Sequence, residues 1–179
     1  EVSEKGDTVI LRGSTTESAA KDALIAKLSE AGIDALDSMV MLPHPALGDK
    51  IFGITNQSAI NFRYSPSYSS ESATQTVMGA PLQILEKRGG WTRAVTPEGY
   101  IAWVSSGSIA YMNESEFNEW RAAQKVIITT HYTLYRAGAS ETSDVVADGI
   151  MGNIVKFVAN AGPYVKVQLP DGREAFVLA

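Results

Sequence analysis

The chain has 179 residues, of which 15 are basic and 20 are acidic, so its formal net charge is −5. Because no basic run is present, the charge pattern argues against nucleic acids, other acidic polymers and anionic membrane surfaces as partners. The absence of cysteine excludes disulfides, a thiolate nucleophile and cysteine-ligated metals, and no apolar run is long enough for a membrane span.

Residues 1–50 are predicted to be a helical segment. Since the chain begins with glutamate and not with methionine, we expect that a leader or a longer parent has been removed. Residues 15–32 carry a helical period, with Thr16 or Ser18 as the N-cap. The apolar residues on one face of this helix are Ala20, Leu24, Ile25, Leu28 and Ala31. A second, short helix is predicted at residues 34–41, and we expect the segment to pack on the domain that follows it.

From Ile51 onward the sequence changes to short runs of β-branched and aromatic residues, separated by Gly, Pro, Asn and Ser. This pattern predicts strands at residues 52–55, 59–63, 82–87, 91–96 and 99–104. Gly89 and Gly90 form one predicted hairpin turn, and residues 97–99 form the next. Because a small barrel leaves the fewest exposed strand edges, we predict that residues 51–112 close into one.

Residues 113–125 connect this barrel to the rest of the chain and are predicted to form a short helix. Asn113 or Ser115 is placed to cap it, and Phe117 and Trp120 fall on one face. We therefore expect a packed connector that holds two domains in a fixed relation, with Trp120 wedged between them.

Residues 126–179 repeat the sequence of the first barrel at a constant separation along the chain, which we call the repeat offset. The matched pairs at this offset are Phe62 with Tyr135, Arg63 with Arg136, Glu71 with Asp144, Gly79 with Gly152, Gly89 with Gly162, Trp91 with Tyr164, Pro97 with Pro170, Gly99 with Gly172 and Trp103 with Phe176. Turn residues match turn residues and apolar residues match apolar residues, which indicates a duplicated folding unit. The predicted fold is therefore mainly β, α+β overall, with a helical N-terminal segment followed by two tandem small barrels.

Several short motifs of the first barrel occur in a distinctive order and spacing. They are Asn61-Phe62-Arg63, Pro66, Ser70-Glu71, Gly79, Gly90-Trp91, Gly99-Tyr100 and Trp103-Val104. In this order they resemble a bacterial SH3-like domain of the kind attached to cell-wall enzymes. The larger layout resembles the secreted NlpC-type cysteine peptidases, which are γ-D-glutamyl-L-diamino acid endopeptidases with a helical segment and two tandem SH3-like domains ahead of the catalytic domain. This resemblance covers residues 34–179.

The catalytic domain of that family uses a cysteine nucleophile, which this chain does not contain. We therefore predict no catalytic residue, no metal and no cofactor, and interpret the chain as the non-catalytic, substrate-gating and targeting portion of a secreted or periplasmic cell-wall peptidase. The resemblance implies peptidoglycan-derived peptides as partners and, if the protein is longer, a C-terminal catalytic domain that cuts γ-D-Glu–diamino acid bonds. The alternative is a stand-alone SH3-like adhesion or scaffold module that binds the cell wall or a protein.

The resemblance also implies two substrate-binding residues, Tyr100 and Glu71, which would hold the free amino group of an N-terminal L-Ala. A carboxylate facing this ammonium group in a desolvated cleft would reject strands that lack the amine. The alternative is that Glu71 is a solvated loop charge and that Tyr100 packs against a strand end. The second copy has Arg173 and Asp144 at these positions, which would neutralise each other, so this copy is interpreted as a spacer or a wall-contacting module.

Large aromatic residues that both copies retain are predicted to lie in the core, namely Trp91, Trp103, Tyr164 and Phe176. The candidates for stacking on a glycan or a peptide at the surface are Tyr64, Tyr68 and Tyr111. His44 is expected to serve in a turn and His131 at a strand start, because the sequence offers no convergent set of metal ligands.

Overall fold

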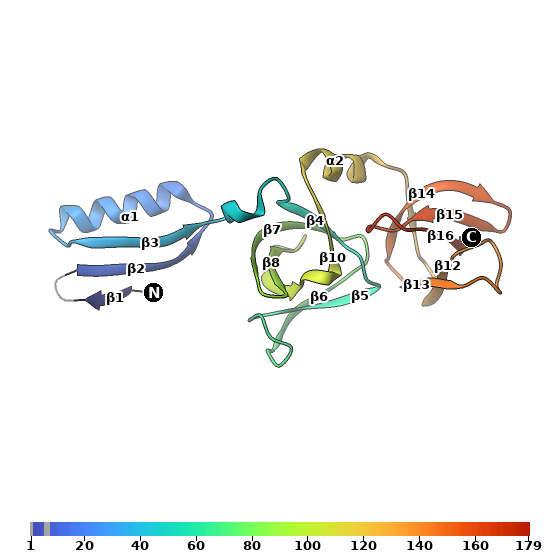
Figure 1. Ribbon diagram of the computed structural model, residues 1–179, viewed down its shortest axis with the longest axis horizontal. Coiled ribbons are helices and arrows are strands. Elements are labelled where there is room, and N and C mark those ends of the chain that lie inside the picture. Colours follow the sequence, from blue (N-terminus) through green and yellow to red (C-terminus); the bar gives the residue numbers. More distant parts are fainter. Residues whose placement is uncertain (1, 6–7) are drawn as a thin grey trace. The chain divides into compact units, whose positions relative to one another are not determined.

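The computed structural model describes residues 2–5 and 8–179, and the chain divides into two compact units, Glu1–Leu47 and Gly48–Ala179. The first unit contains β1 (Val2–Lys5), β2 (Thr8–Thr15), α1 (Ser18–Glu30) and β3 (Ala35–Met41), followed by a 3-10 turn (Pro45–Leu47) (Figure 1). β1 pairs with β2 in antiparallel orientation. β2 pairs with β3 in parallel orientation, and α1 makes the crossover that a parallel pair requires.

The predicted helix at residues 34–41 is wrong, because this stretch forms strand β3. After α1, the chain runs beside β2 and pairs with it from Ala35 to Met41. Pairing with a neighbouring strand satisfies the backbone groups of β3, and this tertiary contact outweighs the local helical pattern. The described part of the predicted helical segment, residues 1–50, therefore combines one α-helix with three strands. Its packing on the domain that follows stays a prediction.

The second unit begins with an antiparallel sheet in residues 51–112, which we call the first repeat. Its strands are β4 (Phe52–Thr55), β5 (Ala59–Arg63), β6 (Ser72–Val77), β7 (Pro81–Arg88), β8 (Trp91–Val95), β9 (Ile101–Ser105) and β10 (Ile109–Met112). Their order in the sheet is β10-β4-β7-β8-β9-β5-β6. The five predicted strands are confirmed, whereas β6 and β10 are additional to the prediction.

This sheet does not close into the predicted barrel, because the described strands β6 and β10 each pair with one neighbour only. β5 meets β9 at a single residue pair, Arg63 with Trp103. The β5–β6 pair also contains a register shift between Phe62 and Arg63. A bulge and a short strand contact allow a sheet to fold over its own core without a closed ring of hydrogen bonds.

The second repeat has the same strand order at the predicted offset. Its strands are β11 (Lys125–Ile127), β12 (Tyr132–Arg136), β13 (Val145–Ile150), β14 (Ile154–Ala161), β15 (Tyr164–Gln168) and β16 (Glu174–Leu178). Their order, β11-β14-β15-β16-β12-β13, again leaves the described sheet open. Strands β12 to β16 follow β5 to β9 at the repeat offset, and the register shifts recur at the same separation. Because β11 begins at Lys125, we define the second repeat as residues 125–179.

The connector is the predicted packed helix, α2 (Glu114–Ala122). The side chain of Asn113 accepts a hydrogen bond from the N–H of Glu116 at 2.9 Å, and the Glu116 carboxylate accepts one from the N–H of Asn113 at 2.7 Å. This capping box satisfies two N–H groups that the start of a helix otherwise leaves without partners. On the buried face, the ring of Phe117 stacks on a phenylalanine ring of β4, with the ring centroids 4.7 Å apart. Trp120 on the same helix is 3% exposed.

The aromatic core of each repeat differs from the prediction. Of the four predicted core aromatics, two are buried, Trp103 and Tyr164, and two are half-buried, Trp91 and Phe176. The fully buried rings are instead Phe62 and its equivalent Tyr135. Among the described residues, the hydroxyl of Tyr135 has no hydrogen-bond partner, and burial raises the pKa of this phenol well above its usual value.

The two repeats are joined through Met78, at the turn between β6 and β7. Its side chain is 1% exposed and belongs to the hydrophobic core of the second repeat. The other buried members of this core are Ile128, Tyr135, Val155, Val167, Leu169, Ala175 and Val177. A side chain of one repeat therefore completes the core of the other.

Hydrogen bonds and a close backbone approach fix this junction. The N–H of Ile154 donates to the carbonyl of Met78 at 2.9 Å, and the side-chain amide of the buried Asn153 donates to the carbonyl of Ser58 at 2.8 Å. Gly79 has a φ of +93°, and a Cβ atom added to it would lie 2.3 Å from the carbonyl oxygen of Ile154. The repeats therefore meet without room for a larger residue at position 79.

The junction can be tested with two methionines at equivalent positions, since Met151 matches Met78 but is 50% exposed. We expect Met78→Ala to lower the free energy of unfolding by about 2–5 kcal/mol, because it opens a cavity in the second core. Met151→Ala should change it by about 0.5 kcal/mol or less. Urea unfolding followed by tryptophan fluorescence measures both values, and equal losses in the two variants would contradict the burial of Met78 between the repeats.

Candidate functional site

The first repeat carries a groove with a volume of about 250 Å³ beside the loop at residues 64–71. It is lined by Gln57, Ala59, Ile60, Asn61, Arg63, Tyr68, Trp91, Val104, Ser105 and Ser108. The lining combines two aromatic rings and a guanidinium group with amide and hydroxyl side chains and with apolar strand residues. A surface of this kind can hold a ligand by stacking and orient it with a few hydrogen bonds.

One wall of the groove is an aromatic pair, Tyr68 and Trp91. Their ring centroids are 4.8 Å apart and the ring planes are tilted by 58°. Tyr68 is 74% exposed, as expected for a stacking residue, whereas Trp91 is half-buried and was predicted to lie wholly in the core. A large ring that both repeats retain can therefore line a groove, as Trp91 does, and does not always lie in the core.

The loop beside the groove is held by a network that both repeats share. In the first repeat, Nη1 of Arg63 donates to the carbonyl of Ser70 at 2.6 Å. In the second repeat, Nη1 of Arg136 donates to the carbonyl of Ser143 at 2.8 Å. A hydrogen bond from a charged group to a backbone carbonyl is strong enough to order a short loop. The matched arginines therefore shape one wall of a groove in each repeat.

The second repeat has a groove at the equivalent place, with a volume of about 360 Å³. It is lined by Tyr132, Thr133, Leu134, Arg136, Glu141, Tyr164 and Leu178, and each of these matches a lining residue of the first groove at the repeat offset. The chemistry differs, because Glu141 stands where the first repeat has Tyr68. The second groove thus replaces an exposed ring with a carboxylate, so the two grooves offer a ligand different chemistry.

The two residues that the sequence singled out, Tyr100 and Glu71, lie outside the first groove. Tyr100 is 49% exposed in the turn before β9, where its N–H donates to the hydroxyl of Thr96 at 3.3 Å. Glu71 is exposed just before β6, and its carbonyl accepts from the N–H of Tyr64 at 3.2 Å. Within the part of the chain that is described, no hydrogen bond joins the two side chains, and their role in binding stays a prediction.

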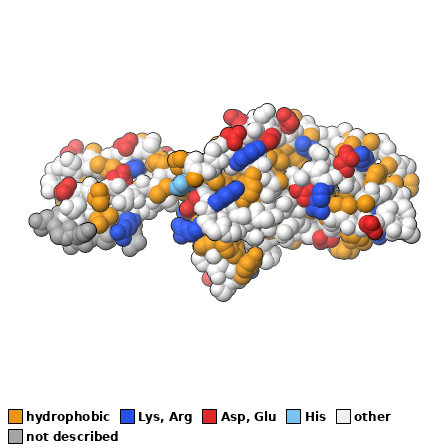
Figure 2. All heavy atoms as spheres, in the orientation of Figure 1, with side chains coloured by type: hydrophobic (Ala, Val, Ile, Leu, Met, Phe, Trp, Pro, Cys, Tyr) orange, Lys and Arg blue, Asp and Glu red, His pale blue; other side chains and the backbone are white. Residues whose placement is uncertain are grey.

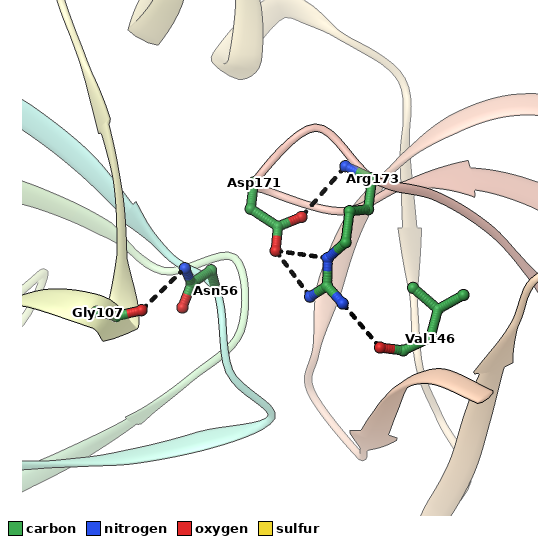
Figure 3. A network of polar contacts seen from close by, with 5 residues as sticks. All are labelled: Asn56, Gly107, Val146, Asp171 and Arg173. Carbon is green, nitrogen blue, oxygen red and sulfur yellow. Dashed lines mark hydrogen bonds and ion pairs between the residues drawn. The ribbon is translucent and has the colours of Figure 1, made fainter.

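Figure 3 shows Arg173, which occupies the position in the second repeat that is equivalent to Tyr100 at the repeat offset. Its Nε donates to the carboxylate of Asp171 at 2.8 Å, and its Nη1 donates to the carbonyl of Val146 at 2.8 Å. The predicted pairing of Arg173 with Asp144 is therefore wrong. Asp171 lies close to Arg173 in the same turn, so it reaches the guanidinium more easily.

The residues of the first repeat that match these contacts at the repeat offset form what we call the corner around Tyr100. Asp171 corresponds to Glu98, and Val146 corresponds to Ala73, which lies shortly after Glu71 in the chain. Glu98 and Tyr100 thus lie in one turn, and the placement of Glu71 beside them stays a prediction. Glu98 was not among the candidates predicted from the sequence, although the match of Pro97-Glu98-Gly99 with Pro170-Asp171-Gly172 contained the signal.

The remaining sequence candidates lie outside the first groove. Tyr111 is half-buried, its hydroxyl lies 2.6 Å from that of Thr92, and the ammonium of Lys87 lies 3.4 Å from its ring centroid. His44 serves in its turn as predicted, since its Nδ1 accepts from the N–H of Ala46 at 3.1 Å. Tyr64 is exposed but does not line the groove.

Acidic and basic side chains alternate over the visible face of residues 48–179 (Figure 2). No helix in residues 2–5 and 8–179 has both the length and the apolar character that crossing a bilayer requires. The same residues contain no group of three or more His, Asp or Glu side chains placed to hold a metal ion.

Comparison with known proteins gives a family match and a fold match. Residues 58–110 match the family described as "Bacterial SH3 domain". An NlpC/P60 family protein from Bacillus cereus ATCC 10987 has a similar structure, with a TM-score of 0.59 at 14% identity, covering 71% of this chain and 54% of that one. An NlpC/P60 endopeptidase from Photobacterium damselae subsp. piscicida gives a TM-score of 0.51 at 15% identity, covering 77% and 34%.

These structural likenesses show a shared fold, and this chain spans only about half and about a third of the two proteins' lengths. No curated protein sequence matches the chain. The predicted SH3-like domain is thus supported in the first repeat by sequence, and the NlpC/P60 likeness by structure.

The shared arginine clamp can be tested by hydrogen exchange. We expect Arg63→Met to speed exchange of amides in the loop at residues 64–71 by about tenfold or more, because a hydrogen bond to a charged group contributes about 1.5–3 kcal/mol. Exchange in the matching loop, residues 137–144, should stay unchanged. Arg136→Met is the matched control and should give the reverse pattern. If either variant loosened both loops, or neither, the clamps would not act locally.

Proposed function

We propose that residues 48–179 are the non-catalytic, substrate-gating and targeting portion of a bacterial cell-wall cysteine peptidase, built from two tandem SH3-like domains. The bacterial SH3 match at residues 58–110 supports this for the first repeat, and the constant repeat offset between equivalent strands extends it to the second. The likeness of the fold to NlpC/P60 proteins supports the association with a peptidase. The chain itself has no cysteine, so a thiolate nucleophile would have to come from a further domain.

The proposed substrate is a peptidoglycan-derived peptide with a free N-terminal L-Ala, which binds at the corner formed by Tyr100, Glu71 and Glu98. The observation that carries this proposal is the guanidinium of Arg173 in the second repeat, held between the carboxylate of Asp171 and a backbone carbonyl. The first repeat keeps an acidic residue at the equivalent position but has the exposed Tyr100 in place of the arginine. An ammonium group from the substrate can therefore take the place of the internal cation.

This arrangement explains how the first repeat would select cleaved peptides. A free amino terminus carries a positive charge that two carboxylates attract, and the phenol hydroxyl can accept a further hydrogen bond. An amide nitrogen in an intact strand carries no charge, so binding it would leave the carboxylates unpaired. The second repeat is closed to such a ligand, because Arg173 already occupies its corner.

The duplicated grooves favour one alternative, a stand-alone module that adheres to the intact cell wall. Tyr68 and Trp91 offer an aromatic wall for stacking on glycan or peptide. Retention on purified sacculi separates the two functions, because adhesion predicts strong retention that Trp91→Ala abolishes. Gating predicts weak retention that this substitution leaves unchanged.

Calorimetric titration with L-Ala-γ-D-Glu-diaminopimelate tests the gating function. We expect Glu71→Gln, Glu98→Gln and Tyr100→Phe each to raise Kd, with the two charge-removing substitutions raising it about tenfold, since a hydrogen bond to a charged group contributes about 1.5–3 kcal/mol. The N-acetylated peptide should not bind. Glu141→Gln, which removes an exposed carboxylate of the second groove, is the matched control and should leave Kd unchanged. Unaltered affinity in all three variants would refute the proposed amine site.

A further inference from the structure

A second cavity lies between the two repeats, with a volume of about 420 Å³. This volume falls within the range of about 300–1,000 Å³ that is usual for small-molecule sites. Its walls come from β10, α2, β14 and the turn between β15 and β16. Buried apolar side chains of Ile109, Trp120 and Leu169 contribute to the lining. The cavity is distinct from the two grooves and from the corner around Tyr100.

One polar group in this cavity is buried without a hydrogen bond. The Oδ1 atom of Asn56 has no partner among the described residues. Its Nδ2 donates to the carbonyl of Gly107 at 3.3 Å, which fixes the orientation of the amide (Figure 3). A buried acceptor without a donor is unfavourable, and protein interiors rarely leave one unpaired. Asn56 lines the cavity, so its side-chain amide would sense a ligand bound there.

The charged groups that line the cavity differ in whether they are already paired. Glu116 forms an ion pair with Lys50 at 2.5 Å, and Asp171 forms one with Arg173 at 2.7 Å. Glu119 and Lys156 also line the cavity, and among residues 2–5 and 8–179 neither has an ion-pair partner.

The ammonium group of Lys156 lies near the ring of Trp120, together with that of a second lysine. Its ammonium lies 5.6 Å from the ring centroid, and that of Lys125 lies 5.0 Å from it. Burial and the charge of Lys156 together lower the pKa of Lys125. A carboxylate from a ligand would relieve this repulsion between two cations.

We propose that the cavity between the repeats binds a zwitterionic amino acid or short peptide. The ligand's ammonium group pairs with Glu119, and its carboxylate pairs with Lys156. The apolar part of the ligand packs against Trp120 and Leu169. Because the two unpaired charges have opposite signs, the site selects ligands that carry both charges over ligands that carry only one. This function is additional to the gating proposed above.

Nuclear magnetic resonance titration with the dipeptide L-Ala-L-Ala tests the proposal. Saturable shifts are expected at the side-chain amide of Asn56 and the indole N–H of Trp120. N-acetyl-Ala-Ala and Ala-Ala-amide each lack one charge and should bind at least tenfold more weakly. Glu119→Gln and Lys156→Met should each raise Kd at least tenfold. Glu114→Gln, on the same helix but outside the cavity, is the matched control and should leave Kd unchanged.

The same titration distinguishes this site from the corner around Tyr100. Tyr100→Phe should leave the shifts at Asn56 and Trp120 unaltered, whatever its effect on amine binding at the first repeat. The proposal is overturned if these two signals do not move at millimolar dipeptide, if the singly charged analogues bind equally well, or if Glu119→Gln and Lys156→Met bind like the unaltered protein.

Discussion

The insertion of Met78 into the core of the neighbouring repeat is the contact on which the rest of residues 48–179 depends. A single repeat of this length has only a small core, and a core of that size is marginal by itself. Because the first repeat supplies a side chain to the second, separating the repeats would leave a cavity in the second core. The junction bonds from Ile154 and Asn153 add directionality to this packing. The repeats are thereby fixed as one body, and the cavity between them has defined walls.

Duplication has kept the backbone network and changed the side chains at the surface. The arginine clamp, the loop hydrogen bonds and the register shifts recur at the repeat offset. By contrast, Tyr68 is matched by Glu141, and Tyr100 is matched by Arg173. The shared framework positions two similar corners and two similar grooves, and the exchanged residues give each of them a different charge. Under the proposed function, the first repeat recognises a cation at the position where the second repeat supplies one internally.

Much of the fold of residues 48–179 follows from the sequence, because turn residues and alternating apolar residues act locally. The strands at 59–63 and 91–95 and the cap of α2 at Asn113 are of this kind. The strand β3 could not be predicted, since its partner β2 is reached only through a crossover. Met78 and Met151 are equivalent in sequence, and only the approach of the second repeat buries one of them. The partner of Arg173 could not be predicted either, because it depends on which carboxylate the arginine side chain reaches within its turn.

Two glycines at equivalent positions provide the most direct test of the fixed junction. Gly79 and Gly152 have φ values of +93° and +89°, so an alanine is strained to a similar degree at both. At Gly79 the added Cβ would clash with the other repeat, at 2.3 Å from the carbonyl oxygen of Ile154, whereas at Gly152 its nearest atom in the other repeat, Cγ2 of Val77, lies at an ordinary contact distance of 3.8 Å. The measurement is the free energy of unfolding in urea, and Gly79→Ala should lose more of it than Gly152→Ala, by about 1 kcal/mol or more. Equal losses would show that the repeats are not held together at this contact.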